Sequence, residues 1–273
     1  MIRVAVAGAA GKMGGRILSA LRGEADFSIT GAFEQPANPH VGEDAGVVSG
    51  GPKLDVPVTA GLASALSRSG ADVVIDFTAP AASLVHARLC AEKGVALVVG
   101  TTGFSPQARA ELASCAQSVP ILLAPNMSVG VNVLFRLVAQ AARALGPQYE
   151  IEIVETHHRH KRDAPSGTAL RLAEVAADAA GLDPRTACVY ERHGEVGARK
   201  PGTIGVQSLR GGDVVGDHTV FFLADGERLE LTHKATSRDN FARGAVRAAR
   251  FLAGQAPGLY DMQDVLAAPP AVG

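Results

Sequence analysis

The chain has 273 residues, of which 47% are hydrophobic and 19% are charged, and its formal net charge is −1. This length suffices for one large domain or two ordinary ones, each with its own core. A nearly neutral chain lacks the basic surface expected of a nucleic-acid or membrane-surface binder. No apolar run is long enough to cross a bilayer, and the N-terminus predicts a strand rather than a signal peptide. We therefore expect a cytoplasmic protein without nucleic-acid or membrane partners.

The cysteines argue against a disulfide-stabilised secreted protein. Cys90, Cys115 and Cys188 are odd in number and far apart in the sequence, so they do not form a disulfide framework. We expect them to be buried as small apolar side chains in a protein of a reducing compartment.

The N-terminal segment predicts a dinucleotide-binding turn. Ile2 to Ala7 is an apolar run typical of a buried parallel strand, and it leads into a glycine-rich turn and an amphipathic helix. Strand, glycine turn and helix in this order are the context that a dinucleotide fingerprint requires. Gly8 allows a tight turn, Gly11 lets the backbone approach a pyrophosphate, and Gly14 lets the helix pack closely on the strand.

A second apolar run strengthens this interpretation. Phe27 to Phe33 predicts the next strand, and it ends in Glu34, 20 residues after Gly14. An acidic residue at this distance binds the hydroxyl groups of the adenosine ribose. The alternative, that the glycines only form a turn, does not explain the acidic residue.

Strand and helix patterns then alternate through the first half of the chain. Apolar strands are predicted at 71–77, 95–99 and 120–124, with helices from Pro80 to about residue 89 and at 105–117. Such repetition predicts a doubly wound parallel sheet, whose ligands bind beyond the carboxyl ends of the strands. Asp76 to Thr78, Gly100 to Gly103 and Ala124 to Met127 follow three such ends, so we expect them to line the nicotinamide end of a cofactor. Taken alone, the glycine segment at 100–103 is an ordinary turn between strand and helix.

The pattern changes after residue 130. The predicted elements are helices at 131–145, 165–180 and 240–252 and strands at 149–156, 204–209, 218–223 and 228–235. Consecutive strands with two helices predict an α+β second domain built on an open mixed sheet. Its face, rich in Val, Ile and Leu, is a candidate oligomer interface. The last helix carries one apolar stripe, and we expect it to pack back on the first domain.

The segment from Glu155 to Leu170, ETHHRHKRDAPSGTAL, concentrates the chemically active residues. His157 and His158 can donate a proton near neutral pH, where imidazole titrates. Lys161 and its neighbouring arginines supply positive charge. These groups suit a small ligand with carboxylates and a reactive C=N or C=O bond.

The same segment predicts the start of a helix that binds an anion. Pro165 suits the first helical turn, where its missing N–H is not needed. The N–H groups of Gly167 and Thr168, with the hydroxyls of Ser166 and Thr168, would then face a negatively charged group.

Other interpretations of this segment are less specific. A run of charged residues is usually a solvated face. Three histidines within four residues also suggest zinc, but no cysteine lies nearby and the spacing differs from H-E-x-x-H, so we expect no metal. A nucleic-acid patch is disfavoured because the segment has no aromatic residue.

Together these segments resemble the 4-hydroxy-tetrahydrodipicolinate reductase (dihydrodipicolinate reductase) family. The matching stretches span Ile2 to Leu252 and read VAVAGAAGKMG, DFT, GTTGF, APNMSVGVN, ETHHRHKRDAPSGTAL, SLRGGDVVGDHTVFF and LTHKATSRDNFARGAVRAARFL. The block E-x-H-H-x-x-K-x-D-A-P-S-G-T-A is highly specific, whereas the glycine fingerprint is not. The resemblance implies a Rossmann domain made from both chain ends, at 1–127 and 239–273. It also implies a substrate-binding and tetramerisation domain at 128–238.

The resemblance also implies residue roles. His157 matches the family's proposed proton donor and Lys161 its catalytic or substrate-polarising lysine. His158 matches a residue that touches the substrate, and the carboxylate cradle matches Ser166, Gly167 and Thr168. The cofactor site predicted from the residues and the resemblance together consists of Gly8, Gly11, Lys12, Met13, Gly14, Glu34, Gly100, Thr101, Thr102, Ala124, Asn126 and Met127.

The implied activity is the NAD(P)H-dependent reduction of 4-hydroxy-tetrahydrodipicolinate to tetrahydrodipicolinate in diaminopimelate and lysine biosynthesis, by a homotetramer. Many relatives follow the acidic residue with an arginine that can hold the 2′-phosphate of NADPH, but Gln35 follows Glu34 here. We therefore expect both NADH and NADPH to serve. One alternative is another Rossmann reductase acting on a small keto or imino dicarboxylate. The other, a non-catalytic nucleotide sensor, is expected to lack His157 or Lys161, and both are present.

Overall fold

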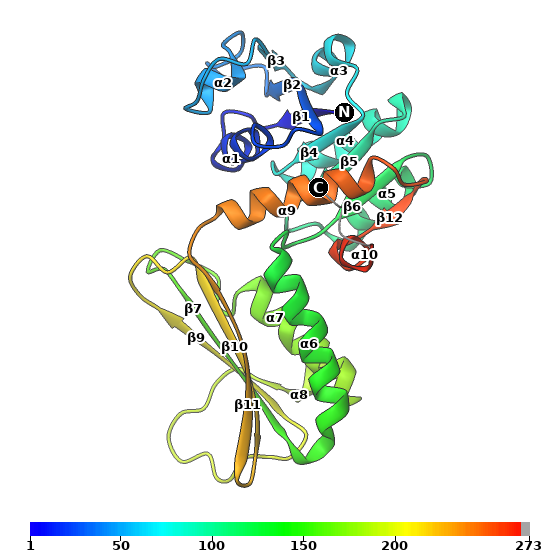
Figure 1. Cartoon of the computed structure of the whole chain (residues 1–273). Helices are drawn as coiled ribbons and strands as arrows, with labels where there is room; N and C mark the ends of the chain where they lie inside the picture. Colours follow the sequence, from blue (N-terminus) through cyan, green and yellow to red (C-terminus); the bar gives the residue numbers. More distant parts are fainter. Residues whose placement is uncertain (269–273) are drawn as a thin grey trace. The chain divides into compact units, whose positions relative to one another are not determined.

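The computed structural model describes residues 1–268 and shows two compact units (Figure 1). Unit 1 consists of Met1–Val129 and the chain from Asp239 onward, and unit 2 is Gly130–Arg238. The helix predicted at 240–252 therefore belongs to the same unit as the N-terminal strands, as expected.

Unit 1 contains a seven-stranded sheet of order β12-β6-β5-β4-β1-β2-β3, and all of its strand pairs are parallel. The strands are β1 Ile2–Ala7, β2 Phe27–Glu34, β3 Val58–Ala60, β4 Val73–Asp76, β5 Ala96–Val99, β6 Pro120–Leu123 and β12 Gly258–Tyr260. The helices are α1 Lys12–Leu21, α2 Ala45–Val48, α3 Leu62–Ser69, α4 Pro80–Lys93, α5 Pro106–Cys115, α9 Asp239–Leu252 and α10 Met262–Ala267. This confirms the doubly wound parallel sheet completed by the C-terminal segment.

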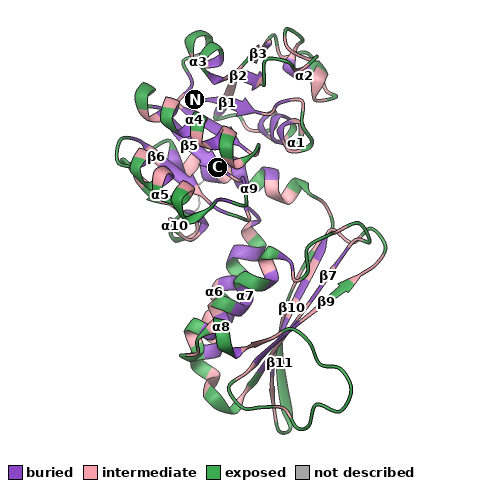
Figure 2. Ribbon diagram, turned by 180° about the vertical axis from the view of Figure 1, so that it is seen from behind, coloured by how far each residue is buried: buried purple, intermediate pink, exposed green. Residues whose placement is uncertain are grey.

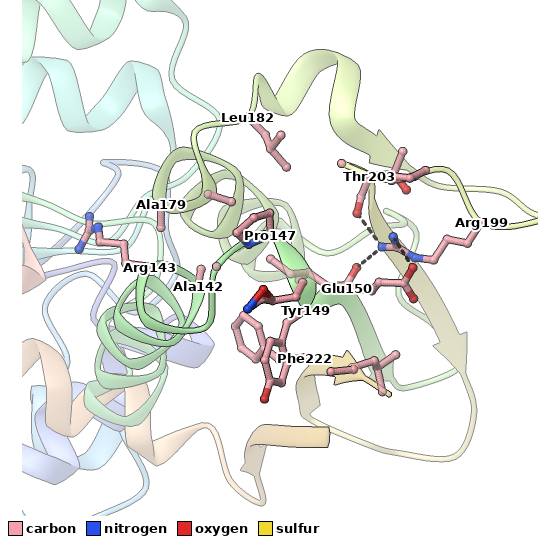
Figure 3. Close-up of a pocket in the computed structure, with 18 of the residues that line it drawn as sticks. Ala142, Arg143, Pro147, Tyr149, Glu150, Ala179, Leu182, Arg199, Thr203 and Phe222 are labelled. Atoms are coloured by element: carbon pink, nitrogen blue, oxygen red, sulfur yellow. Dashed lines mark hydrogen bonds and ion pairs between the residues drawn. The ribbon is translucent and has the colours of Figure 1, made fainter. Parts of the chain in front are cut away.

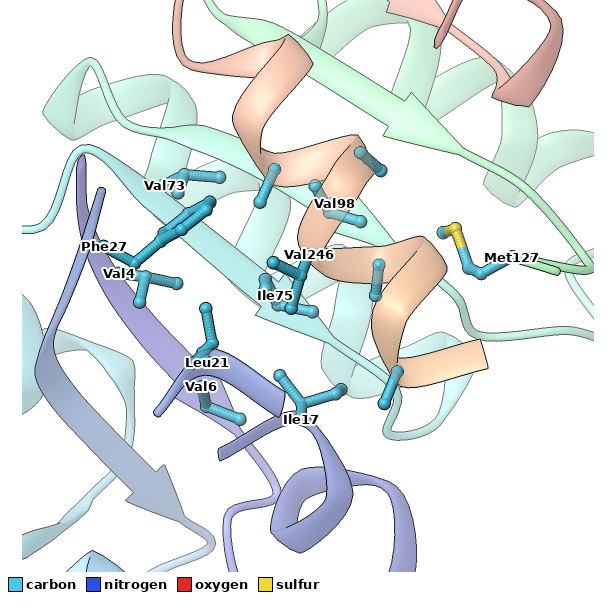
Figure 4. Close-up of a cluster of buried hydrophobic side chains, with 14 of the residues drawn as sticks. Val4, Val6, Ile17, Leu21, Phe27, Val73, Ile75, Val98, Met127 and Val246 are labelled. Carbon is cyan, nitrogen blue, oxygen red and sulfur yellow. The ribbon is translucent and has the colours of Figure 1, made fainter. Parts of the chain in front are cut away.

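Two hydrophobic clusters cover the two faces of this sheet. On one face, α1, α9 and α10 pack on residues such as Val6, Ile75 and Val98. Figure 4 shows Val246 of α9 beside Ile75 in this cluster. On the other face, α3, α4 and α5 cover residues such as Val74. Figure 2 shows the buried residues gathered in the strands between these helices.

Five short elements of unit 1 are absent from the sequence prediction. They are α2, β3, α3, β12 and α10. The strands have three residues each and the helices four to eight, so none is long enough to show a hydrophobic period.

Unit 2 is built on a five-stranded mixed sheet of order β11-β10-β7-β9-β8. Its strands are β7 Glu150–His157, β8 Cys188–Val189, β9 Ile204–Arg210, β10 Gly216–Ala224 and β11 Glu227–Ala235. Its helices are α6 Val129–Leu145, which begins one residue before the unit, the short η1 Gly146–Gln148, α7 Gly167–Ala180 and α8 Pro184–Ala187. β10 is antiparallel to both neighbours, whereas β7, β9 and β8 run parallel.

The two faces of this sheet differ from the prediction. Apolar side chains such as Ile153, Val206 and Val220 form one core with α6 and α7, so the face rich in Val and Ile is covered. Within unit 2 the other face carries a mixture that includes Phe221 beside Glu152, because successive residues of a strand point to opposite sides. The open face is therefore mixed, whereas the sequence predicted a face rich in Val, Ile and Leu as the candidate oligomer interface.

The start of α7 also differs from the prediction. The helix begins at Gly167 rather than Pro165, because Ser166 has extended backbone angles and its hydroxyl caps the helix by accepting the N–H of Ala169. Pro165 precedes the capping residue and lies outside the helix.

Candidate active site

The glycine turn of unit 1 leaves no room for a side chain at Gly14. Gly8 has a φ of +61°, a conformation that favours glycine. The N–H of Gly11 donates to the Gly8 carbonyl at 2.8 Å. A Cβ on Gly14 would lie 2.0 Å from the same carbonyl oxygen, so α1 approaches β1 as closely as backbone permits. This geometry fits a pyrophosphate at the start of α1.

The end of β2 lies against this turn. The Glu34 carboxylate accepts the N–H of Ala10 at 3.0 Å. Lys12 and Met13 form the first turn of α1, where Lys12 is exposed and Met13 packs on the core. The Glu34 carboxylate thus lies beside the glycine turn, where an adenosine ribose would bind.

The ends of β4 and β5 form the next part of this edge. The buried Asp76 carboxylate accepts the N–H and hydroxyl of Thr78 at 2.8 and 2.6 Å, and contacts Nδ1 of His86 at 2.8 Å. A Cβ on Gly100 would lie 2.2 Å from the ring of Phe77. A side chain at residue 100 would therefore displace the Phe77 ring.

The remaining predicted cofactor residues differ in exposure. Thr102 is exposed, whereas Thr101 is buried and accepts the Ser83 hydroxyl at 2.9 Å. Ala124 and Met127 belong to the core, and Met127 is labelled beside α9 in Figure 4. Asn126 is half-buried. Thr101, Ala124 and Met127 can therefore offer a ligand mainly their backbone.

In unit 2, a buried cluster surrounds His157 at the end of β7. Nδ1 of His157 contacts the Glu155 carboxylate at 2.5 Å. The Arg210 guanidinium binds both oxygens of this carboxylate at 2.8 Å, and the N–H of Ser166 donates to it at 3.0 Å. The ring of His218 meets that of His157 edge-on, with centroids 5.2 Å apart.

These contacts set the charges of the cluster. Burial alone would raise the pKa of Glu155, but hydrogen bonds from Arg210 and His157 lower it to about 2. Burial lowers the pKa of His157, while Glu155 opposes this change and Lys161 adds to it. Burial also lowers the pKa of His218 to about 3. The cluster therefore holds an ionised carboxylate beside a neutral His218.

The predicted substrate residues surround the start of α7. Ser166 is buried, and its hydroxyl also contacts Nε2 of His218 at 3.0 Å, so it acts as a cap rather than an open donor. Gly167 is exposed, with nothing within 4 Å of a Cβ position, and Thr168 follows it in the first helical turn. The helix start is thus open at Gly167.

Lys161 and His158 lie in the loop between β7 and α7. The Lys161 ammonium pairs with Asp163 at 2.9 Å, and its side chain is 20% exposed. The N–H of Lys161 donates to the His158 carbonyl, and the N–H of His158 donates to Val214. Backbone hydrogen bonds therefore fix the loop at His158 and at Lys161.

No role for Glu155, Arg210 or His218 is predicted from the sequence. Each lies inside a segment that carries the family resemblance, but their proximity depends on strand pairing. His218 lies opposite Glu155 across β10 and β7, and Arg210 lies opposite His157 across β9 and β7. The alternation of Glu155 and His157 on one strand was the only local signal.

A separate hollow of about 900 Å³ lies at the C-terminal ends of α6 and α7. Figure 3 shows Tyr149, Glu150 and Phe222 at this hollow, with the Arg199 guanidinium bonded to backbone carbonyls. None of the predicted site residues lines it. Within residues 1–268 there is no group of three or more His, Cys, Asp or Glu that could hold a metal ion. None of the described helices is long and apolar enough to cross a membrane.

Comparison with known families matches both units. The family model "Dihydrodipicolinate reductase, N-terminus" matches residues 2–127, and the family model "Dihydrodipicolinate reductase, C-terminus" matches residues 130–266. The chain belongs to the dihydrodipicolinate reductase family. The 4-hydroxy-tetrahydrodipicolinate reductases of Anaeromyxobacter dehalogenans (strain 2CP-C) and Myxococcus xanthus (strain DK1622) are 59% and 54% identical to it over 266 residues. Each match covers 97% of this chain and 98% of the relative.

A solved member of the dihydrodipicolinate reductase family has the same fold. The dipicolinate-bound dihydrodipicolinate reductase from Paenisporosarcina sp. TG-14 aligns with a TM-score of 0.77 and 24% identity. The alignment covers 96% of this chain and 97% of that one. The family membership and the fold predicted from the sequence are thus confirmed.

Proposed function

We propose that this protein reduces 4-hydroxy-tetrahydrodipicolinate to tetrahydrodipicolinate with NADH or NADPH, in diaminopimelate and lysine biosynthesis. The observation that carries the proposal is the cluster of His157, Glu155 and Arg210 at the end of β7, with Lys161 in the loop that follows β7. It offers a proton donor and positive charge to a cyclic dicarboxylate. The relatives named above support the choice of substrate.

Unit 1 has the features that a nicotinamide dinucleotide needs. The glycine turn can receive the pyrophosphate, Glu34 the adenosine ribose, and the ends of β4 to β6 the nicotinamide end. When bound, NAD(P)H supplies the hydride for the reduction. Gln35 carries no charge that would hold a 2′-phosphate, while Lys12 is exposed nearby. This combination favours use of both coenzymes.

Unit 2 supplies the groups for the substrate. The conversion also releases the 4-hydroxyl group of the substrate as water. Hydride transfer to the ring leaves developing negative charge, which a protonated His157 can quench by donating from Nε2. Although burial lowers the pKa of His157, two substrate carboxylates nearby would raise it again. Binding of the dianion would therefore favour the protonated donor.

The other residues bind the substrate's charge. Lys161 can exchange its partner Asp163 for a substrate carboxylate, because the Asp163 side chain is exposed. Gly167 and Thr168 lie at the start of α7, where backbone N–H groups and the helix dipole favour an anion. His158 precedes Lys161 in the loop and completes the proposed contacts.

A coupled assay with freshly made substrate tests the proposal by following NAD(P)H absorbance. The unmodified protein should turn over, and His157→Gln and Lys161→Ala should lose most of this activity. Turnover of another keto or imino dicarboxylate, but not of this substrate, would favour the alternative reductase. Absence of any coenzyme oxidation would contradict the enzymatic assignment.

We also propose a homotetramer, in which the open face of the five-stranded sheet pairs with other copies. Phe221 and Val154 on that face offer apolar contact area, and closed symmetry is the general rule for homo-oligomers. Light scattering should give about four times the mass of one chain at micromolar concentration, whereas the mass of a single chain would contradict the proposal. Cytoplasmic localisation stays a prediction.

A further inference from the structure

The carboxylate beside His157 is held in an unusually complete set of contacts. Glu155 is fully buried. Its two oxygens accept hydrogen bonds from the two terminal nitrogens of the Arg210 guanidinium and from the N–H of Ser166, and they contact Nδ1 of His157. Arg210 also donates to the Asp163 carbonyl at 2.7 Å. A buried carboxylate with a bidentate arginine partner remains ionised, because its charge is paired and hydrogen-bonded.

This arrangement selects one form of the imidazole. An ionised carboxylate can only accept hydrogen bonds, so Nδ1 of His157 must carry a proton in order to pair with Glu155. Nε2 is then the nitrogen that gains and loses the exchangeable proton. A Cβ on Gly216 would lie 2.9 Å from Nε2. The absence of a side chain at this residue thus leaves space next to the nitrogen that is free to titrate.

The other charged and titratable groups around His157 do not favour its protonated form. Lys161 and Arg210 are cations and disfavour a protonated imidazole. His218, on β10, is buried and neutral, and its Nε2 contacts the Ser166 hydroxyl. Glu155 is therefore the group in contact with His157 whose charge favours the protonated ring.

We propose that Glu155 is a positioning residue for the proton donor. It holds His157 as the Nδ1–H form with Nε2 available to the substrate, and Arg210 keeps the carboxylate ionised and in place. This inference rests on the proposed function, in which His157 donates the proton. A purely structural network would hold β7, β9 and the start of α7 together without changing the protonation of His157.

The variant Glu155→Gln tests this role in the full-length protein. We expect kcat to fall by about 10- to 100-fold. The limb of the pH profile on which activity is lost as pH rises should shift to lower pH by about one unit or more, because an opposite charge has been removed. The KM for substrate and the dissociation constant of pyridine-2,6-dicarboxylate should change by less than about threefold. Glu155→Asp should restore part of kcat.

Glu152→Gln provides a matched control on the same strand. Glu152 is partly buried and is paired with two arginines, Arg192 at 2.8 Å and Arg199 at 3.0 Å. It contacts no histidine in the described residues and points to the opposite face of β7. We expect an unchanged pH profile. Equal losses of kcat in both variants, without any pH shift, would show a structural role and overturn the proposal.

A measurement independent of activity distinguishes this proposal from the proposed function. In protein labelled with 15N-histidine, the His157 signal, assigned by its loss in His157→Gln, should show the Nδ1–H form. An Nε2–H form, or wild-type kcat and pH profile in Glu155→Gln, would overturn the proposal. An inactive native protein that shows the Nδ1–H form would instead contradict only the proposed function. If Glu155→Gln does not fold, the labelled unmodified protein still decides, because an Nε2–H form of His157 would contradict the proposal.

Discussion

Replacing Gly14 with alanine should damage both the stability and the coenzyme site of unit 1. The new Cβ would lie 2.0 Å from the Gly8 carbonyl oxygen, 2.7 Å from its carbon and 2.8 Å from Cα of Ala9. All three are backbone atoms, so no side-chain rotation can relieve the contact. Helix α1 must move away from β1 by about 1 Å or more to restore ordinary contact.

The expected cost follows from two opposing effects. Overpacking of this kind costs about 1–3 kcal/mol, whereas alanine in place of glycine within a helix gains about 1 kcal/mol. Because the neighbours are backbone, we expect a net loss of about 2 kcal/mol. In a domain of this size that loss lowers the melting temperature by about 4–8 °C. The displaced helix start should also weaken coenzyme binding by about tenfold or more.

Gly15→Ala is the matched control, one residue later in the same helix. Its Cβ would lie 3.7 Å from Cβ of Ser49, which is ordinary contact, so the helix should gain up to about 1 kcal/mol. Thermal unfolding followed by circular dichroism and coenzyme titration followed by fluorescence measure both effects. Equal melting temperatures and equal coenzyme affinities for Gly14→Ala and the unmodified protein would refute the packing argument.

His157→Gln should lower kcat by about 10²-fold or more, whereas Thr168→Ala should mainly raise the KM for substrate. If the NAD(P)H assay showed the same changes of kcat and KM in both variants, these separate roles would be contradicted. NADH and NADPH should give kcat/KM values within about tenfold, because Glu34 repels a 2′-phosphate and Gln35 does not bind one; an inert NADH would contradict this. Folding lowers the pKa of Glu155 from 4.5 to about 2. The ionised carboxylate therefore stabilises the folded protein by about 3 kcal/mol above pH 4.5, and this stabilisation is lost as pH falls towards 2. Urea unfolding between pH 6 and 3 should show this loss, and Glu155→Gln should reduce it.

Local sequence patterns determined most of unit 1. The strand Ile2–Ala7 has the predicted bounds, and β2 is one residue longer than predicted because it includes Glu34. Apolar runs, glycine turns and helical periods arise from neighbouring residues, so they are visible without a structure. The helix predicted from Pro165 begins two residues later, because Ser166 is its cap and not a helical residue.

Only the tertiary structure decided how the site around His157 is held. Arg210 lies 55 residues from Glu155 in the chain, and His218 lies 52 residues from Ser166. Their contacts depend on the register of β9 and β10 against β7. The sequence alone predicted His157, Lys161 and the region in which α7 begins as parts of the site, because they lie within one short segment. Strand register results from packing over the whole sheet, and no local pattern around these residues encodes it.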